Sequence, residues 1–217
     1  MKRRDLLAGM SSLAATAAAL SPIMVRAQSP APQPGVDFKS LDKAAPIEAP
    51  KGKIEIIEFF WYSCPHCNAF ESTLASWVKK LPKDVAFKRV PIAFQDSFVP
   101  QQRLFYALEA LGLLDKLHTR VFAAIHDEKQ KLSKGEEITN WMVKQGIDKA
   151  KFLAQFDSFS TATKASRATQ LQTAYQVEGV PALGVAGRFY TDGELAKNMD
   201  RVLQVVDHLT AEVRRGH

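Results

Sequence analysis

The chain has 217 residues, of which 46% are hydrophobic, and a formal net charge of +6 at pH 7. Residues 1–27 contain four basic residues and one acidic residue, so the remainder carries about +3. Basic residues spread along the expected helices indicate solvated faces, and the composition gives no reason to expect a nucleic-acid partner. The chain has two cysteines, Cys64 and Cys67, which excludes a framework of structural disulfides.

The N-terminus has the features of a targeting segment. Basic residues at positions 2–4 precede an apolar stretch rich in Leu and Ala, and Val25-Arg26-Ala27 fits the pattern at which signal peptides are cleaved. We therefore expect residues 1–27 to be a signal peptide cleaved after Ala27, and the mature chain to enter an oxidising compartment. Residues 3–7 also resemble part of a twin-arginine signal, so the general secretory and twin-arginine routes both stay open.

The next residues lead into a strand. Residues 28–37 are rich in Pro and predict a disordered linker, and residues 36–41 predict an edge strand. Residues 53–60 form a nearly continuous apolar run, as a strand buried on both faces of a sheet requires. Two acids interrupt this run. We expect Glu55 to face outward, whereas Glu58 is either outward-facing or functional, because a charge inside an apolar run is costly without a partner.

Cys64-Pro65-His66-Cys67 follows this strand directly and is the most informative motif. Apolar residues at helical spacing predict a helix from Pro65 to about Lys80. Pro suits the first helical position, so Cys64 is expected at the N-cap, where its sulfur faces unpaired backbone N–H groups. Cys67 then lies one turn further along the same face. A C-x-x-C motif between a strand and a helix is typical of a dithiol redox site.

Two simpler interpretations of the cysteine pair are weaker. A structural disulfide across two intervening residues would constrain the unfolded chain very little. A zinc site needs four ligands, and the remaining histidines are scattered without ligand spacing; they are His118, His126, His208 and His217. Zinc shared between two chains stays open, but we expect no metal and no cofactor other than the redox-active pair itself.

The rest of the chain completes an α/β fold. Residues 85–90 predict a second strand, which makes a right-handed βαβ unit with the first. Helical periodicity dominates from about residue 100 to 175, and strands return at 182–185 and 189–191, joined by a turn at Gly187-Arg188 and followed by a closing helix. The order βαβ, helical block, ββα predicts a thioredoxin fold with an inserted helical domain. The thioredoxin-like domain would comprise residues 38–97 and 177–217, and the insertion residues 98–176.

These motifs together resemble the DsbA family of periplasmic thiol:disulfide oxidoreductases. The family's C-P-H-C motif is present at residues 64–67, its L-E-F-F run appears as Ile57-Glu58-Phe59-Phe60, and its G-V-P signature appears as Gly179-Val180-Pro181. In the family this proline is cis and faces the disulfide. The helical insertion and the Pro-His pair between the cysteines distinguish the family from plain thioredoxins. Residues 92–103 carry no pattern that aligns with the family.

The resemblance implies a periplasmic dithiol oxidase, a monomer that donates its Cys64–Cys67 disulfide to reduced or unfolded exported proteins. It implies that His66, with Pro65 beside it, favours the Cys64 thiolate, and that Glu58 exchanges a proton with Cys67. Val180 and Pro181 would bind extended substrates through the backbone. A quinone-linked membrane protein of the DsbB type would reoxidise the pair.

Two other classes of function stay open. One is a disulfide isomerase or reductase of the same fold, although isomerases of this compartment usually carry a separate dimerisation domain, for which the Pro-rich linker is too short. The other is a non-catalytic chaperone-like or metal-binding module. Stoichiometric zinc without exchange activity would favour the latter.

Overall fold

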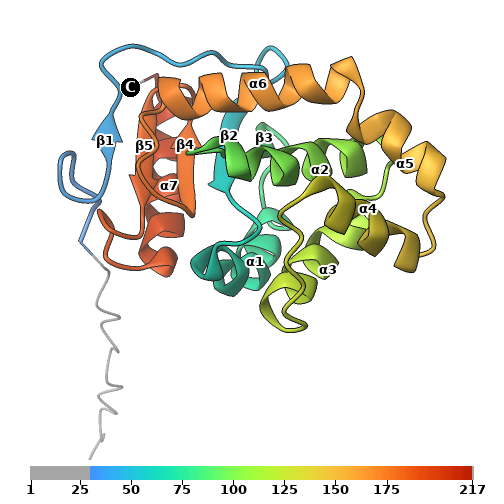
Figure 1. The fold of residues 1–217 in the computed structure, drawn as a ribbon. Helices are drawn as coiled ribbons and strands as arrows, with labels where there is room; N and C mark the ends of the chain where they lie inside the picture. Colours follow the sequence, from blue (N-terminus) through green and yellow to red (C-terminus); the bar gives the residue numbers. More distant parts are fainter. Residues whose placement is uncertain (1–29, 217) are drawn as a thin grey trace, which may run out of the picture. The chain divides into compact units, whose positions relative to one another are not determined.

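The computed structural model describes residues 30–216, so the expected signal peptide and its cleavage site lie outside the described residues. From Ala31 onwards the chain forms one compact unit. Within the described residues, strands form a single five-stranded mixed sheet in the order β1-β5-β4-β2-β3 (Figure 1). The strands are β1 (Lys39–Ser40), β2 (Ile54–Phe60), β3 (Val85–Pro91), β4 (Ala182–Val185) and β5 (Phe189–Asp192).

Strand β2 lies inside the sheet and leads to the cysteine motif. It pairs in parallel with β3, so that Glu58 lies opposite Arg89, and antiparallel with β4, so that Glu58 also lies opposite Leu183. Helix α1 (Pro65–Val78) connects β2 to β3, which confirms the predicted βαβ unit. Neighbours on both sides and helices on both faces explain why the apolar run of β2 is almost continuous.

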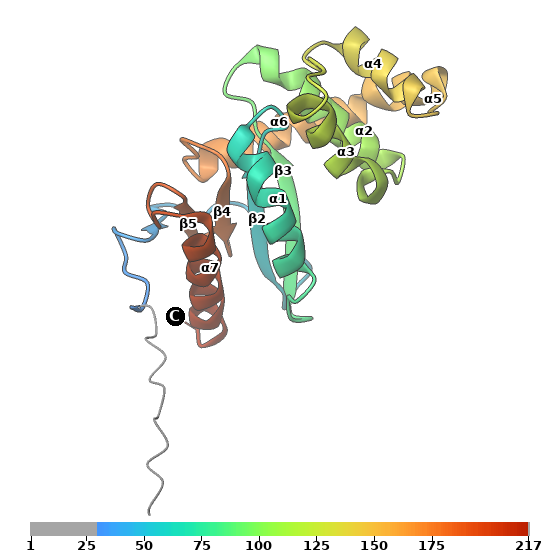
Figure 2. The ribbon, with the colours of Figure 1, turned by 90° about the horizontal axis from the view of Figure 1, so that it is seen from below.

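Helices cover both faces of the sheet. Helices α1 and α7 (Met199–Arg214) lie on one face, where their apolar residues pack with Ile56 and Leu183 (Figure 2). On the other face, Ile57 and Phe59 belong to a second cluster that includes Leu171 of α6 (Phe159–Ala174). The sheet therefore separates two cores: Ile56 of β2 contributes to one, and Ile57, Phe59 and Phe60 contribute to the other.

The expected helical block lies between β3 and β4. It consists of the 3-10 helix η1 (Asp96–Phe98) and the helices α2 (Val99–Ala110), α3 (Leu114–His126), α4 (Gly135–Lys144), α5 (Lys149–Phe156) and α6. The apolar residues that give this block its helical periodicity are buried, as shown by Leu104, Val121 and Met142, each with 0% exposure. None of the helices within residues 30–216 is both long and apolar enough to span a membrane.

The prediction of a disordered linker over residues 28–37 is wrong for the part that the structure describes. Gly35 has a φ of +77°, which lets the chain turn back, and its N–H donates to the Phe38 carbonyl at 2.8 Å. Asp37 accepts a hydrogen bond from Gln33 N–H and forms an ion pair with Arg201 of α7 at 2.9 Å. The edge strand that follows is shorter than predicted, because only Lys39 and Ser40 pair with β5.

Glu55 does not face outward as predicted: its side chain is 1% exposed. It faces Lys88 of β3 at 3.1 Å and accepts a hydrogen bond from Glu48 N–H at 2.9 Å. A cation and a backbone donor offset the desolvation of the carboxylate, which is why an acid can lie in this strand.

The hairpin of β4 and β5 is present, with its turn one residue earlier than predicted. Its central residues are Ala186 and Gly187, with φ of 52° and 67°, and Arg188 N–H closes the turn by donating to the Val185 carbonyl. Tyr175, just after α6, packs so closely on β4 that a Cβ at Gly184 would come within 2.3 Å of its ring. Glycine is therefore required at residue 184.

Candidate active site

The cysteine motif begins α1 as the sequence predicts. Cys64 is the N-cap, Pro65 occupies the first turn, and Cys64 Sγ accepts a hydrogen bond from Cys67 N–H at 3.4 Å. Both cysteines are free thiols. Cys64 is 7% exposed and Cys67 1% exposed, whereas Pro65 and His66 lie on the surface. Cys64 is therefore the more accessible thiol of the pair.

The surroundings of Cys64 favour its thiolate. The pKa of Cys64 is lowered to about 6, and hydrogen bonding from the Cys67 thiol is the largest cause. The backbone N–H groups of Cys67 and His66 and the charge of His66 act in the same direction, whereas burial acts against them. Direct hydrogen bonds thus outweigh the remote charge of His66. Such a thiolate is a good leaving group in disulfide exchange.

Cys67 has the opposite character. Burial raises the pKa of its thiol far above the ordinary range, and hydrogen bonding to Cys64, the negative charge of Cys64 and the charge of Glu58 act in the same direction. Cys67 therefore requires a proton as soon as the disulfide opens.

The G-V-P segment lies against Cys64. The Val180–Pro181 peptide bond is cis, and Cys64 Sγ donates to the Val180 carbonyl at 3.3 Å. A cavity of about 530 Å³ lies beside this contact and is lined by His66, the 179–181 segment and residues from Asp192 to Met199. This cavity offers an extended chain a place next to the reactive sulfur.

Glu58 is buried beneath the motif, with 1% of its side chain exposed. Its Oε2 lies 3.0 Å from Arg89 Nε. Burial raises the pKa of Glu58 to about 8, although the charge of Arg89 acts in the opposite direction. The outward-facing alternative is therefore wrong, and Glu58 holds its proton at neutral pH.

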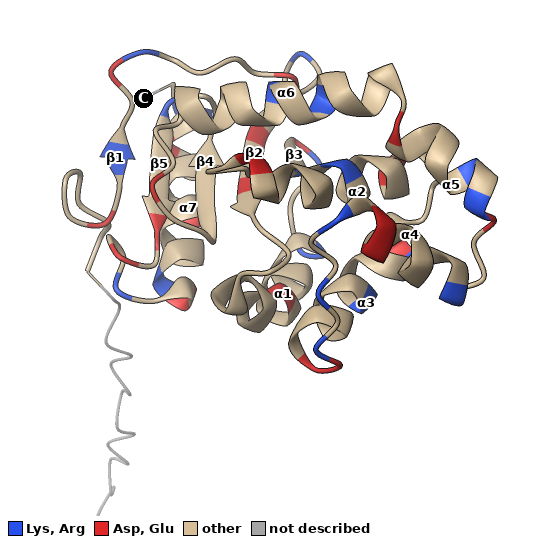
Figure 3. Cartoon of the chain, viewed as in Figure 1, with Lys and Arg blue, Asp and Glu red and all other residues tan. Residues whose placement is uncertain are grey.

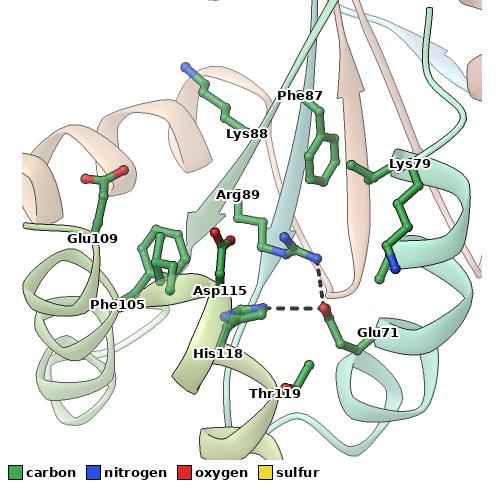
Figure 4. A pocket seen from close by; sticks show the side chains of 13 residues that line it. Glu71, Lys79, Phe87, Lys88, Arg89, Phe105, Glu109, Asp115, His118 and Thr119 are labelled. Atoms are coloured by element: carbon green, nitrogen blue, oxygen red, sulfur yellow. Dashed lines mark hydrogen bonds and ion pairs between the residues drawn. The ribbon is translucent and has the colours of Figure 1, made fainter. Parts of the chain in front are cut away.

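Arg89 connects Glu58 to a buried set of residues that the sequence analysis did not identify. Arg89 Nη2 donates to Glu71 Oε1 at 2.8 Å, and Glu71 Oε2 lies 3.5 Å from His118 Nε2 (Figure 4). His118 Nδ1 lies 2.9 Å from the Tyr62 hydroxyl. The charges of Glu71 and Arg89 inside otherwise apolar periodic segments could have indicated buried partners, but nothing in the sequence pairs either with His118.

The helical block also holds the residues just before Cys64. Gln101 Nε2 of α2 donates to Ser63 Oγ at 2.7 Å and to the Leu132 carbonyl at 3.0 Å, and His126 Nε2 donates to the Tyr62 carbonyl at 2.8 Å. The ring of Trp61 stacks on Phe98, with centroids 3.8 Å apart. Residues 92–103, which could not be aligned from sequence, therefore contact the segment that leads into the motif, through Phe98 and Gln101.

Apart from the pairing of Lys88 with Glu48 and Glu55, the other charged residues within residues 30–216 are mixed in sign. Figure 3 shows basic and acidic residues interspersed over the described elements. No group of three or more His, Cys, Asp or Glu side chains within residues 30–216 is arranged to hold a metal ion.

Comparisons with known proteins point to one family. A family described as DSBA-like thioredoxin domain matches residues 78–206. The chain is 39% identical over 191 residues to the thiol:disulfide interchange protein DsbA of Burkholderia cepacia, covering 88% of this chain and 90% of the relative. It is 42% identical over 200 residues to the protein of the same name from Bordetella parapertussis, covering 92% and 95%.

Solved structures give the same result. The crystal structure of Pseudomonas aeruginosa DsbA superimposes with a TM-score of 0.80 at 38% identity, covering 84% of this chain and 94% of that one. The oxidoreductase DsbA from Xylella fastidiosa has a TM-score of 0.78 at 29% identity, covering 85% and 98%. The predicted thioredoxin fold with a helical insertion is confirmed.

Proposed function

Because this chain belongs to the DsbA family and is a thiol:disulfide oxidoreductase, we propose that its Cys64–Cys67 disulfide is donated to newly exported proteins. One observation carries the assignment of roles. Two thiols one helical turn apart have pKa values displaced in opposite directions, that of Cys64 downward and that of Cys67 upward. The greater exposure of Cys64 directs attack to its sulfur. The pKa asymmetry makes Cys64 the better leaving group when the mixed disulfide is resolved and makes Cys67 take up a proton once the disulfide has opened.

The first step of the reaction is attack on Cys64. A substrate thiolate forms a bond to Cys64 Sγ, the bond between Cys64 and Cys67 breaks, and its electron pair goes to the Cys67 sulfur. A second thiolate of the substrate then attacks the substrate sulfur of the mixed disulfide and releases the Cys64 thiolate. The substrate ends oxidised by two electrons and the cysteine pair ends reduced.

Glu58 is proposed to supply the proton that Cys67 takes up. It is protonated at neutral pH, and its ionised form lies close enough to raise the pKa of Cys67. Proton transfer turns the departing sulfur into a neutral thiol, and the charge of Arg89, 3.0 Å away, stabilises the carboxylate that remains. His66 and Pro65 act at the other sulfur, where His66 favours the Cys64 thiolate.

Substrate binding is proposed beside the cis peptide bond. Val180 offers its backbone to an extended substrate segment, and Pro181 holds that backbone at the level of Cys64. The cavity lined by His66, Val180 and Met199 would receive side chains next to the substrate cysteine.

The proposed setting is the periplasm, since the N-terminal signal pattern and an otherwise disulfide-free chain suit export to an oxidising compartment. We propose that the protein acts as a monomer and that a membrane quinone reductase of the DsbB type reoxidises it. The cysteine pair itself is the redox group, so the proposal includes no further cofactor and no metal.

The test uses the oxidised protein with an unstructured peptide that carries two cysteines. We expect rapid stoichiometric oxidation of the peptide and an equilibrium with glutathione that lies far toward the reduced protein. An equilibrium on the side of the disulfide would instead indicate a reductase. Stoichiometric zinc in the purified protein, without any exchange, would indicate the metal-binding alternative.

A further inference from the structure

Buried polar side chains connect Glu58 with the helical block. Arg89 faces two carboxylates: Glu58 on β2, 3.0 Å from its Nε, and Glu71 on α1, 2.8 Å from its Nη2. Glu71 also faces His118 of α3, with 3.5 Å between Oε2 and Nε2 (Figure 4). The two carboxylates therefore share one guanidinium, and the histidine adds a second partner to Glu71.

The surroundings of His118 determine which of its ring nitrogens carries the hydrogen. Nε2 lies 3.5 Å from Glu71 Oε2, and neither of these two buried atoms has another hydrogen-bond partner within residues 30–216, so Nε2 carries the hydrogen and directs it toward the carboxylate. Nδ1 then accepts from the Tyr62 hydroxyl, 2.9 Å away. Burial raises the pKa of Tyr62 well above its ordinary value, so the hydroxyl stays protonated, and burial lowers the pKa of His118, so the ring is neutral at neutral pH. Tyr62 thus orients His118 toward Glu71.

One guanidinium cannot offset two buried negative charges, so only one of the two carboxyl groups ionises at low cost. Although burial acts against it, hydrogen bonding to His118 and the positive charge of Arg89 hold the pKa of Glu71 below its ordinary value. Glu58 has Arg89 as its charged partner but no histidine, and it keeps its proton. His118, the second partner of Glu71, is therefore the contact that makes Glu71 easier to ionise than Glu58.

We infer that His118 is a positioning residue for the redox reaction: by donating to Glu71 it makes Glu71 the ionised partner of Arg89 and leaves the proton on Glu58. This inference rests on the proposed function for one step, the transfer of that proton to Cys67. Without the donor at residue 118, Arg89 would pair with an ionised Glu58 and the proton would move to Glu71. A residue of the helical block would therefore control the proton supply of a thiol in the thioredoxin-like part.

The other charged side chains around His118 do not favour either acid. A second cavity, of about 500 Å³, is lined by His118, Glu71 and Arg89. The other charged side chains that line it are Lys79 of α1, Lys88 of β3, Glu109 of α2 and Asp115 of α3 itself (Figure 4). They comprise two cations and two anions, so their net effect is small compared with the direct contacts of Glu71 and Arg89.

The direct test is to titrate the two carboxyl groups in the reduced protein, by NMR of protein labelled with ¹³C at the glutamate side chains. In the unmodified protein we expect Glu58 to titrate near pH 8. In His118→Phe the midpoint of Glu58 is expected to fall by about 1–2 pH units and that of Glu71 to rise, because a hydrogen bond to a charged group has been lost. His118→Gln retains an N–H at the position of Nε2, so we expect it to restore the Glu58 midpoint. His208→Phe, on α7, is the control and is expected to change neither midpoint.

Oxidation of the dithiol peptide gives a second measurement. At pH 7 the rate is expected to fall about 2- to 10-fold in His118→Phe, following the loss of protonated Glu58, and to recover in His118→Gln. If His118→Phe does not fold, His118→Asn replaces it, since Asn has no atom at the position of Nε2. An unchanged Glu58 midpoint in either folded variant overturns the inference. The midpoint of Glu58 can be measured whether or not Glu58 donates a proton to Cys67. An unchanged rate of peptide oxidation in Glu58→Gln would contradict only the proposed function.

Discussion

The redox site has a region at the surface and a region beneath it, and the two have opposite effects on the pKa values of their cysteines. In the surface region, formed by Cys64, His66 and Val180, hydrogen bonds to the sulfur lower the pKa of Cys64 to about 6. In the buried region, formed by Cys67, Glu58, Arg89, Glu71 and His118, burial raises the pKa of Cys67 and brings that of Glu58 to about 8. The two cysteines are three residues apart, yet one is suited to hold negative charge and the other to hold a proton.

The difference comes from position along α1. At the N-cap, backbone N–H groups have no partner within the helix and are available to a sulfur. One turn further, Cys67 lies against the sheet, where desolvation dominates. A single helix start thus produces both environments, and the following experiments change one region at a time.

The largest effect is expected from removing one sulfur. Cys64→Ala should abolish peptide oxidation, because the accessible thiol is lost. Cys67→Ala should instead accumulate mixed disulfides with the oxidised peptide: Cys64 attacks the peptide disulfide, one peptide thiolate leaves, and no second protein thiol remains to release Cys64. Mass spectrometry of the intact protein measures them. Equal trapping by both variants would show that the two regions do not differ in accessibility.

Glu58→Gln acts only on the buried region. We expect peptide oxidation at neutral pH to slow by about 100-fold, the low end of the usual contribution of a general acid. Glu55→Gln is the matched control, because Glu55 is also buried in β2 but pairs with Lys88 and Glu48, at the strand end remote from the cysteines. An equal loss of activity in both variants would point to damage to the strand.

Glu58→Gln should also stabilise the folded protein. The pKa of Glu58 is 4.5 in the unfolded chain and about 8 in the folded protein, so the folded state binds the proton more tightly than the unfolded state. The contribution of Glu58 to the free energy of unfolding is therefore complete below pH 4.5 and is lost as the pH rises to about 8. Gln does not titrate, so the free energy of unfolding of Glu58→Gln should exceed that of the unmodified protein by about 2–3 kcal/mol at pH 7. Urea unfolding across this pH range is the measurement, and a difference that shrinks toward alkaline pH would contradict the assignment.

The surface region predicts that the reduced protein is more stable than the oxidised one. The pKa of Cys64 is lowered from 9.0 to about 6 on folding, so the stabilisation is complete above pH 9 and is lost as the pH falls through 6. At pH 7 it amounts to about 1 kcal/mol after allowance for solvent screening. Denaturant unfolding with and without reductant at several pH values measures it. A clearly more stable oxidised form would favour a reductase.

The smallest effect is expected at His66. His66 is exposed, and its charge contributes less to the low pKa of Cys64 than the hydrogen bonds do. His66→Ser should therefore raise the pKa of Cys64 by less than about one unit and shift the equilibrium with glutathione toward the disulfide by up to about 10-fold. Thiolate absorbance follows the first change, and an unchanged equilibrium would remove His66 from the mechanism.

The surface region could be predicted from local sequence, whereas the buried region could not. Pro65 after an apolar run fixes the helix start and so the place of Cys64. The contact of Val180 with Cys64 was expected only through the family resemblance, because the two residues are far apart in the chain. The burial of Glu55 was missed, since a strand covered on both faces has no polar side to show which way an acid points.

Contacts across three elements explain the other omissions. Glu71, Arg89 and His118 lie on α1, β3 and α3, and their pairing depends on strand register and on how α3 packs against α1. Periodicity finds the buried face of each element but not which polar residues meet there.

Gln101 links the reactive end of α1 to the stability of a distant loop. Its carboxamide donates both to Ser63, which precedes Cys64, and to the Leu132 carbonyl in the loop after α3. Opening of that loop would break one of the two bonds and release the other, so the loop and the motif belong to one cooperative unit. We therefore expect the Cys64 amide, which donates to the Trp61 carbonyl, to exchange with deuterium in the same event as the amides around Leu132. Amide exchange at Cys64 and around Leu132 would then report how often the segment that holds Cys64 opens.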